Sequence, residues 1–275
     1  MQAQIHYELE DSYEHGDDSV EYILENALMP NDDSIEFRHL LEEYHSQLTF
    51  SCDCKNDCTS CCHGASYKYN DQKKELILQE QQPAIIECND LCTCRRQPNL
   101  CKNRRVQYGP RKQLEVFDSR RYNSKGVRTN VDILKGSFIC EYVGELLTIT
   151  EARRRLENVD RDKLMNYILC LREFSKAKDL SVNPSQTTIV DPTCRGNIGR
   201  YLNHSCNPNC EILAVRINSP IPKIGIFAKR DIVALEELCF HYGGGEDGPQ
   251  ESFSKRIMCR CASLNCSGFM PNSII

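Results

Sequence analysis

Short hydrophobic runs separated by polar turns dominate the chain between residues 102 and 245. Residues 137–143 and 223–227 are two such runs, rich in β-branched and aromatic side chains, with Gly, Pro and Asn in the stretches between the runs. This pattern is typical of short strands, so we expect a compact body that is mainly β. Residues 150–156 interrupt the pattern and predict a short helix with Thr150 at its N-cap.

A second helix is predicted ahead of this body. Asp33 and Ser34 can cap a helix, and apolar residues recur behind them at helical spacing. These residues are Phe37, Leu40, Leu41, Tyr44 and Leu48. We expect the resulting amphipathic helix to pack on the body. Near the other end of the chain, the glycine-rich residues 243–249 predict a flexible link.

Charge separates an acidic leader from a basic body. Residues 1–50 hold 13 Asp or Glu and one basic residue, Arg38, so the whole-chain charge of −5 leaves +7 on residues 51–275. The leader could mask a domain that meets anionic partners, or it could be a solvated segment without a role. No apolar stretch reaches the roughly 18 residues of a membrane span, and the first residues do not read as a signal peptide. We therefore expect a protein that is neither secreted nor embedded in a membrane.

The 18 cysteines are the strongest chemical signal in the sequence. In a reducing compartment, closely spaced cysteines are more often metal thiolates than disulfides. Nine of them lie within residues 52–101, namely Cys52, Cys54, Cys58, Cys61, Cys62, Cys88, Cys92, Cys94 and Cys101. Three tetrahedral zinc ions need about 12 ligand positions, which six terminal and three bridging sulfurs supply. The spacing thus favours a three-zinc cluster, whereas a disulfide scaffold would leave one cysteine unpaired.

A second group, Cys259, Cys261 and Cys266, supplies three zinc ligands and needs a fourth. We predict that Cys206 closes this site, and that zinc thereby pins the C-terminal tail to the body. Five cysteines remain outside both groups, most of them in apolar runs that predict small buried side chains. They are Cys140, Cys170, Cys194, Cys210 and Cys239. No cysteine and histidine pair with a third orienting group stands out, which argues against a cysteine hydrolase.

In their order along the chain, these features resemble the pre-SET, SET and post-SET modules of histone-lysine methyltransferases of the suppressor-of-variegation class. The resemblance covers roughly residues 50–270. Besides the nine-cysteine block and the Cys-x-Cys-x4-Cys tail, it rests on three motifs, namely Glu141-Tyr142-Val143-Gly144-Glu145, Gly196-Asn197-Ile198-Gly199-Arg200-Tyr201-Leu202-Asn203-His204-Ser205-Cys206 and Phe240-His241-Tyr242-Gly243.

The resemblance implies a SET-domain fold of small β-sheets with a knot-like C-terminal crossing, an exception to the usual absence of knots. It divides the chain into four parts. These are an acidic leader with one helix (1–49), a pre-SET module with three zinc ions (50–110), a SET catalytic domain (111–245), and a linker with a zinc-bound post-SET tail (246–275).

The implied reaction is methyl transfer from S-adenosylmethionine to a neutral lysine amine held in an aromatic channel. By resemblance, Tyr242 is the principal catalytic tyrosine, Tyr142 adds a second channel hydroxyl, and Tyr167 lies against the channel or the cofactor. Residues implied at the cofactor are Lys125, Gly126, Tyr167, Asn203, His204 and Tyr242. Phe240 stands where the family alternates between Phe and Tyr, and the phenylalanine implies capacity for more than one methyl group.

The resemblance also implies the partners and the location of the protein. The expected substrate is the histone H3 tail or the nucleosome, with the ninth-position lysine favoured, and the tail is expected to add as a β-strand to an exposed sheet edge. A nuclear, chromatin-bound monomer recruited by other chromatin proteins follows from the same comparison. The chain gives no strong signal for sequence-specific nucleic-acid binding, because it lacks a finger-type Cys/His helix and a strong basic stripe.

Two departures from the family pattern leave a second hypothesis open. Family members usually carry Gly-Trp-Gly at a loop against the cofactor, where this chain has residues 123–129 without the tryptophan and the second glycine, and no Trp occurs anywhere in the chain. His241 stands where Asp is usual, which could make activity depend on pH near neutrality. The chain is therefore either an active methyltransferase or a catalytically impaired SET scaffold that binds chromatin partners. Binding of S-adenosylmethionine separates the two.

Overall fold

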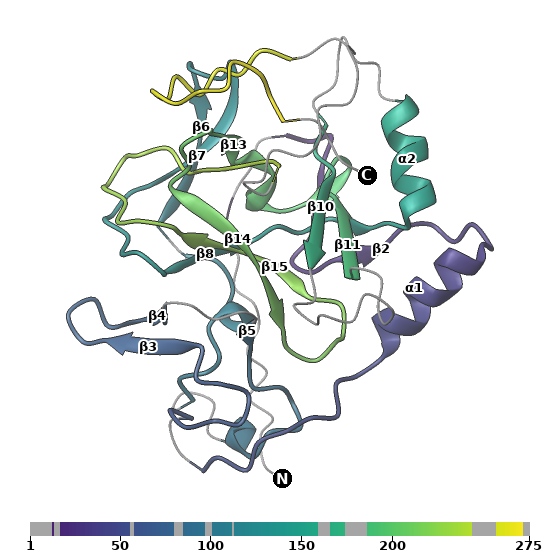
Figure 1. Cartoon of the computed structure of the whole chain (residues 1–275), viewed down its shortest axis with the longest axis vertical. Helices are drawn as coiled ribbons and strands as arrows, with labels where there is room; N and C mark the ends of the chain where they lie inside the picture. Colours follow the sequence, from purple (N-terminus) through teal and green to yellow (C-terminus); the bar gives the residue numbers. More distant parts are fainter. Residues whose placement is uncertain are drawn as a thin grey trace.

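The computed structural model describes residue 13 and residues 17–55, 58–79, 85–96, 101–111, 113–158, 166–173, 186–243 and 257–271. Within these ranges the fold is mainly β, as predicted, with two α-helices, α1 (Ile35–His45) and α2 (Ile149–Asn158). Figure 1 shows both helices on one side of the molecule, away from the hairpin of β3 and β4. The predicted link at residues 243–249 lies outside the described residues beyond Gly243.

Two four-stranded sheets form the centre of the molecule (Figure 1). The first has the order β5-β14-β15-β8, with strands Ile85–Ile86, Cys210–Arg216, Lys223–Ala228 and Phe138–Glu141. The second has the order β10-β11-β9-β2, with strands Leu169–Glu173, Gln186–Asp191, Glu145–Leu146 and Ala27–Leu28. The hydrophobic runs at residues 137–143 and 223–227 thus form β8 and β15, which pair antiparallel.

Two-stranded sheets and short 3-10 helices complete the described fold. The paired strands are β1 (Glu21–Tyr22) with β12 (Arg195–Gly196), β13 (Asn203–His204) with β16 (Cys239–Phe240), β3 (Tyr67–Asn70) with β4 (Glu75–Leu78), and β6 (Leu114–Ser119) with β7 (Ser124–Thr129). The 3-10 helices are η1 (Thr93–Arg96), η3 (Val106–Tyr108) and η4 (Ile198–Tyr201). The β13–β16 pair is parallel, so it brings the C-terminal segment alongside the earlier motif strand, as the expected crossing requires.

The sheet β5-β14-β15-β8 separates two apolar clusters, because successive side chains of a strand point to opposite faces. On β15, Ile224 and Ile226 belong to the larger cluster, whereas Phe227 belongs to the other. That other cluster also contains Tyr67 and Ile85, which come from the cysteine-rich part of the chain. The apolar contacts of the sheet therefore hold both the SET-like body and the β3–β4 hairpin.

The leader packs on the body through β1, β2 and α1. β1 and β2 add parallel strands to β12 and β9. The predicted helix is confirmed as α1, and the Ser34 hydroxyl caps it by accepting a hydrogen bond from the Phe37 amide at 2.9 Å. Phe37 is buried in a cluster with Leu147 and Ala152, so the amphipathic face of α1 contacts the base of α2.

The predicted N-cap of α2 is wrong. The Glu151 amide donates to the Thr148 hydroxyl at 3.2 Å, and the Ala152 amide donates to the Thr148 carbonyl at 3.0 Å. Thr148 is thus the capping residue, two positions before the predicted one. Thr150 instead uses its hydroxyl to donate to the Glu36 carboxylate on α1 at 2.9 Å. Both threonines suit a cap, and only the path of the chain decides between them.

In the described part of the chain, neither helix is long and apolar enough to cross a lipid bilayer.

Candidate active site and metal centres

Three aromatic rings meet at one place in the larger apolar cluster. The ring centroid of Phe240 lies 6.0 Å from that of Tyr142 and 4.9 Å from that of Tyr242. Tyr142 directly follows β8, where its amide donates to the Ile224 carbonyl at 2.8 Å. Tyr242 follows β16 by two residues. Two of the three tyrosines predicted as catalytic, Tyr142 and Tyr242, therefore flank the residue predicted to set product specificity, and Tyr167 is the third.

The hydroxyl groups of these tyrosines are fixed by backbone carbonyls. Tyr142 donates to the Tyr167 carbonyl at 2.5 Å, and Tyr242 donates to the Leu202 carbonyl at 2.9 Å. Burial raises the pKa of both phenols above the usual value for tyrosine. Both groups are consequently protonated near neutral pH, and each retains oxygen lone pairs that can accept a further hydrogen bond.

Tyr167, the third predicted channel residue, reaches the same place through its backbone and its ring. Its carbonyl accepts the Tyr142 hydroxyl, and its ring lies under the guanidinium of Arg200, whose carbon is 4.4 Å from the ring centroid. Arg200 is buried on η4, and its Nε donates to the Pro192 carbonyl at 3.0 Å. A fixed guanidinium over the ring face orients Tyr167 by a cation–π contact.

The predicted cofactor residues Lys125, Gly126 and Asn203 also lie together. The Asn203 side-chain amide donates to the Lys125 carbonyl at 3.0 Å and to Glu237 Oε1 at 2.9 Å. A Cβ added to Gly126 would lie 2.6 Å from that same carboxylate oxygen, so β7 approaches Glu237 as closely as only glycine permits. Glu237 was not predicted from the sequence, since no spacing signal distinguishes it from the neighbouring acidic residue.

His204 connects strand β13 to the aromatic rings. Its Nδ1 accepts from the Tyr242 amide at 3.2 Å, and its carbonyl accepts from the Tyr122 hydroxyl at 2.8 Å. Burial, together with the nearby His241, lowers the pKa of His204 to about 4, so its imidazole is neutral near pH 7. The His204 and His241 ring centroids are 4.9 Å apart. Tyr122 is a further contact that the sequence did not indicate.

Most sulfurs of the nine-cysteine block converge, as the zinc hypothesis requires. Seven of these cysteines form one buried cluster against which Cys54 packs, whereas Cys62 is exposed. The sulfur of Cys88 lies 3.8 Å from those of Cys52 and Cys61 and 3.9 Å from that of Cys58. A tetrahedron of zinc–sulfur bonds of about 2.3 Å has edges of about 3.8 Å, so these separations fit zinc.

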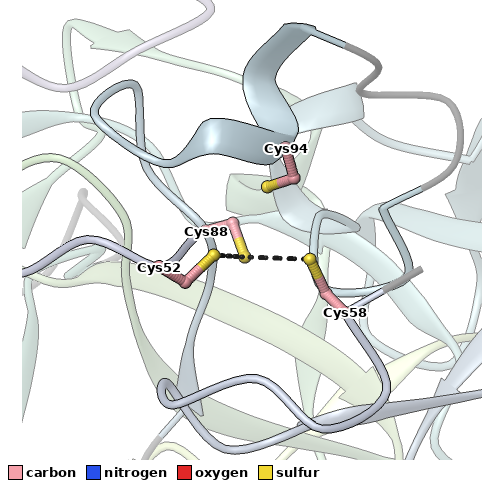
Figure 2. A group of neighbouring side chains, drawn as sticks. All are labelled: Cys52, Cys58, Cys88 and Cys94. Carbon is pink, nitrogen blue, oxygen red and sulfur yellow. Dashed lines mark hydrogen bonds between the residues drawn. The ribbon is translucent and has the colours of Figure 1, made fainter. Parts of the chain in front are cut away.

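Figure 2 shows four of these side chains, Cys52, Cys58, Cys88 and Cys94, with their sulfurs pointing toward one another. These four sulfurs lie within 4.8 Å of one another, as do those of Cys52, Cys54, Cys58 and Cys61. The positive charge next to the thiolates comes from the buried Arg104, whose Nη2 lies 3.7 Å from the Cys94 sulfur. Such a donor helps to offset the negative charge of a thiolate-rich cluster.

The second predicted metal group is assembled as well. The sulfurs of Cys206, Cys259, Cys261 and Cys266 lie within 4.8 Å of one another, and the Cys206 sulfur is 3.8 Å from that of Cys259 and 3.9 Å from that of Cys266. These separations again match the edges of a zinc–thiolate tetrahedron. The tail carrying three of these cysteines thus returns to the loop that follows β13.

The five remaining cysteines lie outside every metal group found among the described residues. Cys140, Cys210 and Cys239 are buried, as predicted for small apolar side chains. Cys170 is half-buried, and Cys194 is exposed. A different residue, His63, does lie among the cysteines of the first cluster. The sequence offered one signal for it, since His63 directly follows the Cys61-Cys62 pair.

Comparisons with known proteins agree with this geometry. The family model of the SET domain matches residues 124–243, and that of the pre-SET motif matches residues 2–104. The probable histone-lysine N-methyltransferase set-23 of Caenorhabditis elegans is 40% identical to the chain over 225 residues, which cover 81% of this chain and 87% of that protein.

Solved structures give the same result. The methyltransferase domain of human histone-lysine N-methyltransferase SETMAR superposes with a TM-score of 0.69 at 31% identity, covering 92% of this chain and 89% of that one. Arabidopsis thaliana SUVH6, solved in complex with S-adenosylmethionine (SAM), superposes with a TM-score of 0.67 at 28% identity, covering 94% of this chain and 51% of that one.

Proposed function

Because the chain belongs to the SET-domain histone-lysine N-methyltransferases, we propose that it transfers methyl groups from SAM to a lysine of the histone H3 tail, with the ninth-position lysine favoured. It is a SAM-dependent protein-lysine methyltransferase. The observation that carries the proposal is the arrangement of Tyr142, Phe240 and Tyr242 beside the Asn203–His204 strand.

We assign the chemistry of the lysine to the aromatic rings. Only a neutral amine can attack a methyl group, and an apolar, ring-lined channel lowers the pKa of a lysine by disfavouring its charged form. The oxygens of Tyr142 and Tyr242 remain able to accept a hydrogen bond from the amine, which would orient its lone pair for in-line attack. SAM, when bound, supplies the methyl group as a sulfonium.

The residues around β13 suit the cofactor. Asn203, His204, Lys125 and Gly126 are the proposed contacts, since the Asn203 side chain already ties the 124–126 segment to β13. The neutral imidazole of His204 adds no positive charge that would repel a sulfonium. Phe240 carries no hydroxyl, so it leaves room for a lysine that already bears a methyl group, and we propose more than one transfer per lysine.

The substrate peptide would add to β10. In the described part of the chain, this strand has a sheet neighbour, β11, on one side only. Leu169 begins β10 two residues after Tyr167, whose carbonyl accepts the Tyr142 hydroxyl. A peptide strand paired along this edge would therefore pass close to the rings, which is how strand addition combines backbone pairing with a side-chain pocket.

We propose structural zinc in both cysteine groups, with three ions in the pre-SET block and one ion bound by Cys206, Cys259, Cys261 and Cys266. The first group would hold the pre-SET module together, and the second would hold the tail beside β13. We further propose a nuclear, chromatin-bound monomer that other chromatin proteins recruit, because its relatives include histone-lysine N-methyltransferases.

A methyl-transfer assay tests this function. Zinc-loaded protein, labelled SAM and recombinant histone octamer should give label on histone H3. Tyr242→Phe should lower the rate by at least about 100-fold, because it removes the positioned hydroxyl but keeps the ring. Tyr69→Phe, at an exposed tyrosine on β3, is the matched control and should leave the rate unchanged. Octamer whose ninth-position H3 lysine is changed to arginine should lose the label, and retained label would assign the activity to another lysine.

A catalytically impaired scaffold is the second candidate, and residues 123–129 favour it. Lys125 lies on β7 and forms an ion pair with Asp118 at 2.7 Å, so its side chain offers no aromatic surface to a cofactor. Calorimetry with SAM separates the candidates. Binding in the micromolar range with methyl transfer supports the enzyme, whereas absence of both supports a scaffold that binds chromatin partners.

A further inference from the structure

Three exposed arginines lie where the turn between β6 and β7 meets the C-terminal tail. Arg120 and Arg121 belong to this turn, which comprises residues 120–123. Arg260 belongs to the tail, and its Nη1 donates to the Tyr122 carbonyl at 3.3 Å. Figure 1 shows the tail, drawn in yellow, beside β6 and β7. Two segments that are far apart in the sequence thus carry three guanidinium groups to one surface.

Tyr122 holds the turn against the body. Its half-buried side chain donates a hydrogen bond from the hydroxyl to the His204 carbonyl at 2.8 Å. Burial raises the pKa of Tyr122 above the usual value for tyrosine, so the hydroxyl keeps its proton near neutral pH. The Arg121 guanidinium donates to the same phenol oxygen. The turn is therefore fixed on β13, the strand to which we assign the cofactor.

The tail is fixed on both sides of its arginine. Arg260 stands between Cys259 and Cys261, which are two of the four donors in the second metal group. A zinc ion in that group would hold the backbone on either side of Arg260. The hydrogen bond to the Tyr122 carbonyl then ties the tail to the turn. The three arginines are thus supported by elements that are themselves anchored.

The positive charge of these arginines is not neutralised within the described part of the chain. None of the ion pairs formed by the described residues includes one of the three. By contrast, the exposed Arg154 pairs with Glu151 at 2.6 Å. The acidic residues near the turn have other partners, because Asp118 pairs with Lys125 at 2.7 Å and Glu237 accepts hydrogen bonds from two side chains of the body. The surface can therefore accept an anion.

The chemistry of the surface favours the backbone of duplex DNA over other polyanions. A guanidinium group matches the geometry of a phosphate, and several such groups on one surface suit a ligand with repeated phosphates. The ring of Tyr122 is turned toward the body, so the turn offers charge and not a ring on which the bases of a single strand could stack. Residues 51–275 also carry a net charge of +7.

We propose that Arg120, Arg121 and Arg260 form a binding site for the phosphate backbone of duplex DNA. The site is independent of base sequence, since guanidinium contacts to phosphates carry no sequence information directly. A nucleosome carries its histones inside wrapped DNA, so a contact at this surface would hold the substrate beside β13. This last step rests on the proposed methyltransferase function, whereas the DNA contact itself does not.

DNA binding by the zinc-loaded full chain tests the site without any methyl transfer. Fluorescence anisotropy with a short labelled duplex of mixed sequence should show salt-dependent binding. Each of Arg120→Ala, Arg121→Ala and Arg260→Ala should make the slope of log K against log salt shallower by about 0.9, because one phosphate contact is lost. The triple variant should bind at least about tenfold more weakly.

The matched control is Arg154→Ala, which removes an exposed arginine that already has a carboxylate partner. Its affinity for the duplex should equal that of the parent chain. Equal affinity of the triple variant and the parent, or an equal loss in Arg154→Ala, would overturn the proposal. Tighter binding of a single strand of the same charge would overturn the assignment to duplex DNA. If the other variants do not fold, Arg120→Ala decides, because Arg120 forms no hydrogen bond with a described residue.

Kinetics test the link to the substrate. In Arg120→Ala, the KM for nucleosomes should rise relative to the KM for histone octamer, which carries no DNA. An unchanged ratio of the two KM values would show that the surface does not hold the substrate. Protein that binds the duplex through these arginines but transfers no methyl group would refute the proposed function and leave the DNA site in place.

Discussion

The two largest buried clusters of the molecule differ in residue composition. The larger cluster of the SET body consists mainly of aliphatic and aromatic side chains on paired strands, among them Ile224, Ile226 and Leu238, which are fully buried. The buried cluster of the pre-SET block consists of seven cysteines, and its described backbone there is mostly loop and short 3-10 helix. The body can bury apolar area by itself, whereas we expect the cysteine block to need metal bound to its thiolates.

A third apolar cluster connects these two regions. Tyr67 and Ile85 of the pre-SET part pack with Phe138, Val215 and Phe227 of the first sheet. The β3–β4 hairpin is therefore held by apolar contacts, although it lies between cysteines in the sequence. We therefore expect the stability of a segment to depend on metal only where cysteines, and not apolar side chains, form its buried contacts. The β3–β4 hairpin should remain folded without zinc, as the body does.

Removal of zinc should produce the largest difference between the regions. A structural zinc site contributes roughly 10–16 kcal/mol of binding free energy, so chelation should unfold the cysteine block. Hydrogen exchange should become fast at the Thr93 amide, which donates to the Cys52 carbonyl. It should stay slow at the Tyr142 amide, which donates to the Ile224 carbonyl in the body. A Thr93 amide that remains protected without zinc would contradict the division.

Cys206→Ser should disconnect the tail alone. The variant removes the one ligand of the second metal group that the body supplies, so the chain should hold one zinc ion fewer. Exchange should become fast at the Met270 amide, which donates to the Ile257 carbonyl, and the cysteine block should stay protected. Cys194→Ser, at an exposed cysteine outside the metal groups, is the matched control. An unchanged zinc count in Cys206→Ser would show that another residue closes the site.

Ile226→Ala probes the region that depends on apolar burial. Truncation of a fully buried isoleucine costs about 2–5 kcal/mol, and the unfolding free energy of the body should fall by that amount in denaturant melts. The zinc content should stay constant below the transition. Val233→Ala, at a side chain that is 64% exposed, should change stability by no more than about 0.5 kcal/mol. Loss of zinc from Ile226→Ala under native conditions would show that the two regions unfold together.

The smallest effect concerns the start of α2. Thr148→Ala removes the hydroxyl that caps the helix and should cost about 1 kcal/mol in the same melts. Thr150→Ala removes an exposed hydrogen bond to Glu36, and it should cost less. A larger loss for Thr150→Ala would return the cap to the residue that the sequence pattern suggested.

Sequence patterns predicted the elements whose structure depends mainly on residues close by in the chain. The β-branched runs predicted β8 and β15, and helical spacing behind Ser34 predicted α1. Cysteine spacing predicted both metal groups, and the need for a fourth thiolate singled out Cys206, which the structure brings beside Cys259. In these cases a composition rule or a ligand count was enough.

Long-range contacts determined the rest. β1 and β2 have only two residues each, so their existence depends on partners in β12 and β9 that no periodicity reveals. Glu237 becomes a neighbour of Gly126 only when the β6–β7 hairpin packs against it. Such a tertiary contact leaves no pattern in the sequence. His63 lies among the cysteines of the first cluster, a contact that a count of cysteines alone does not indicate.

The pairing of β1 with β12 has a consequence for biosynthesis. Glu21 and Arg195 are hydrogen-bonded partners separated by 174 residues, so β1, the first strand of the described residues, leaves the ribosome long before its neighbour exists. At about 5–20 residues per second, the acidic leader waits on the order of ten seconds or more in an open state. Its 13 carboxylates keep it solvated in that interval. β1 can pair with β12 only after residues 195–196 have been synthesised.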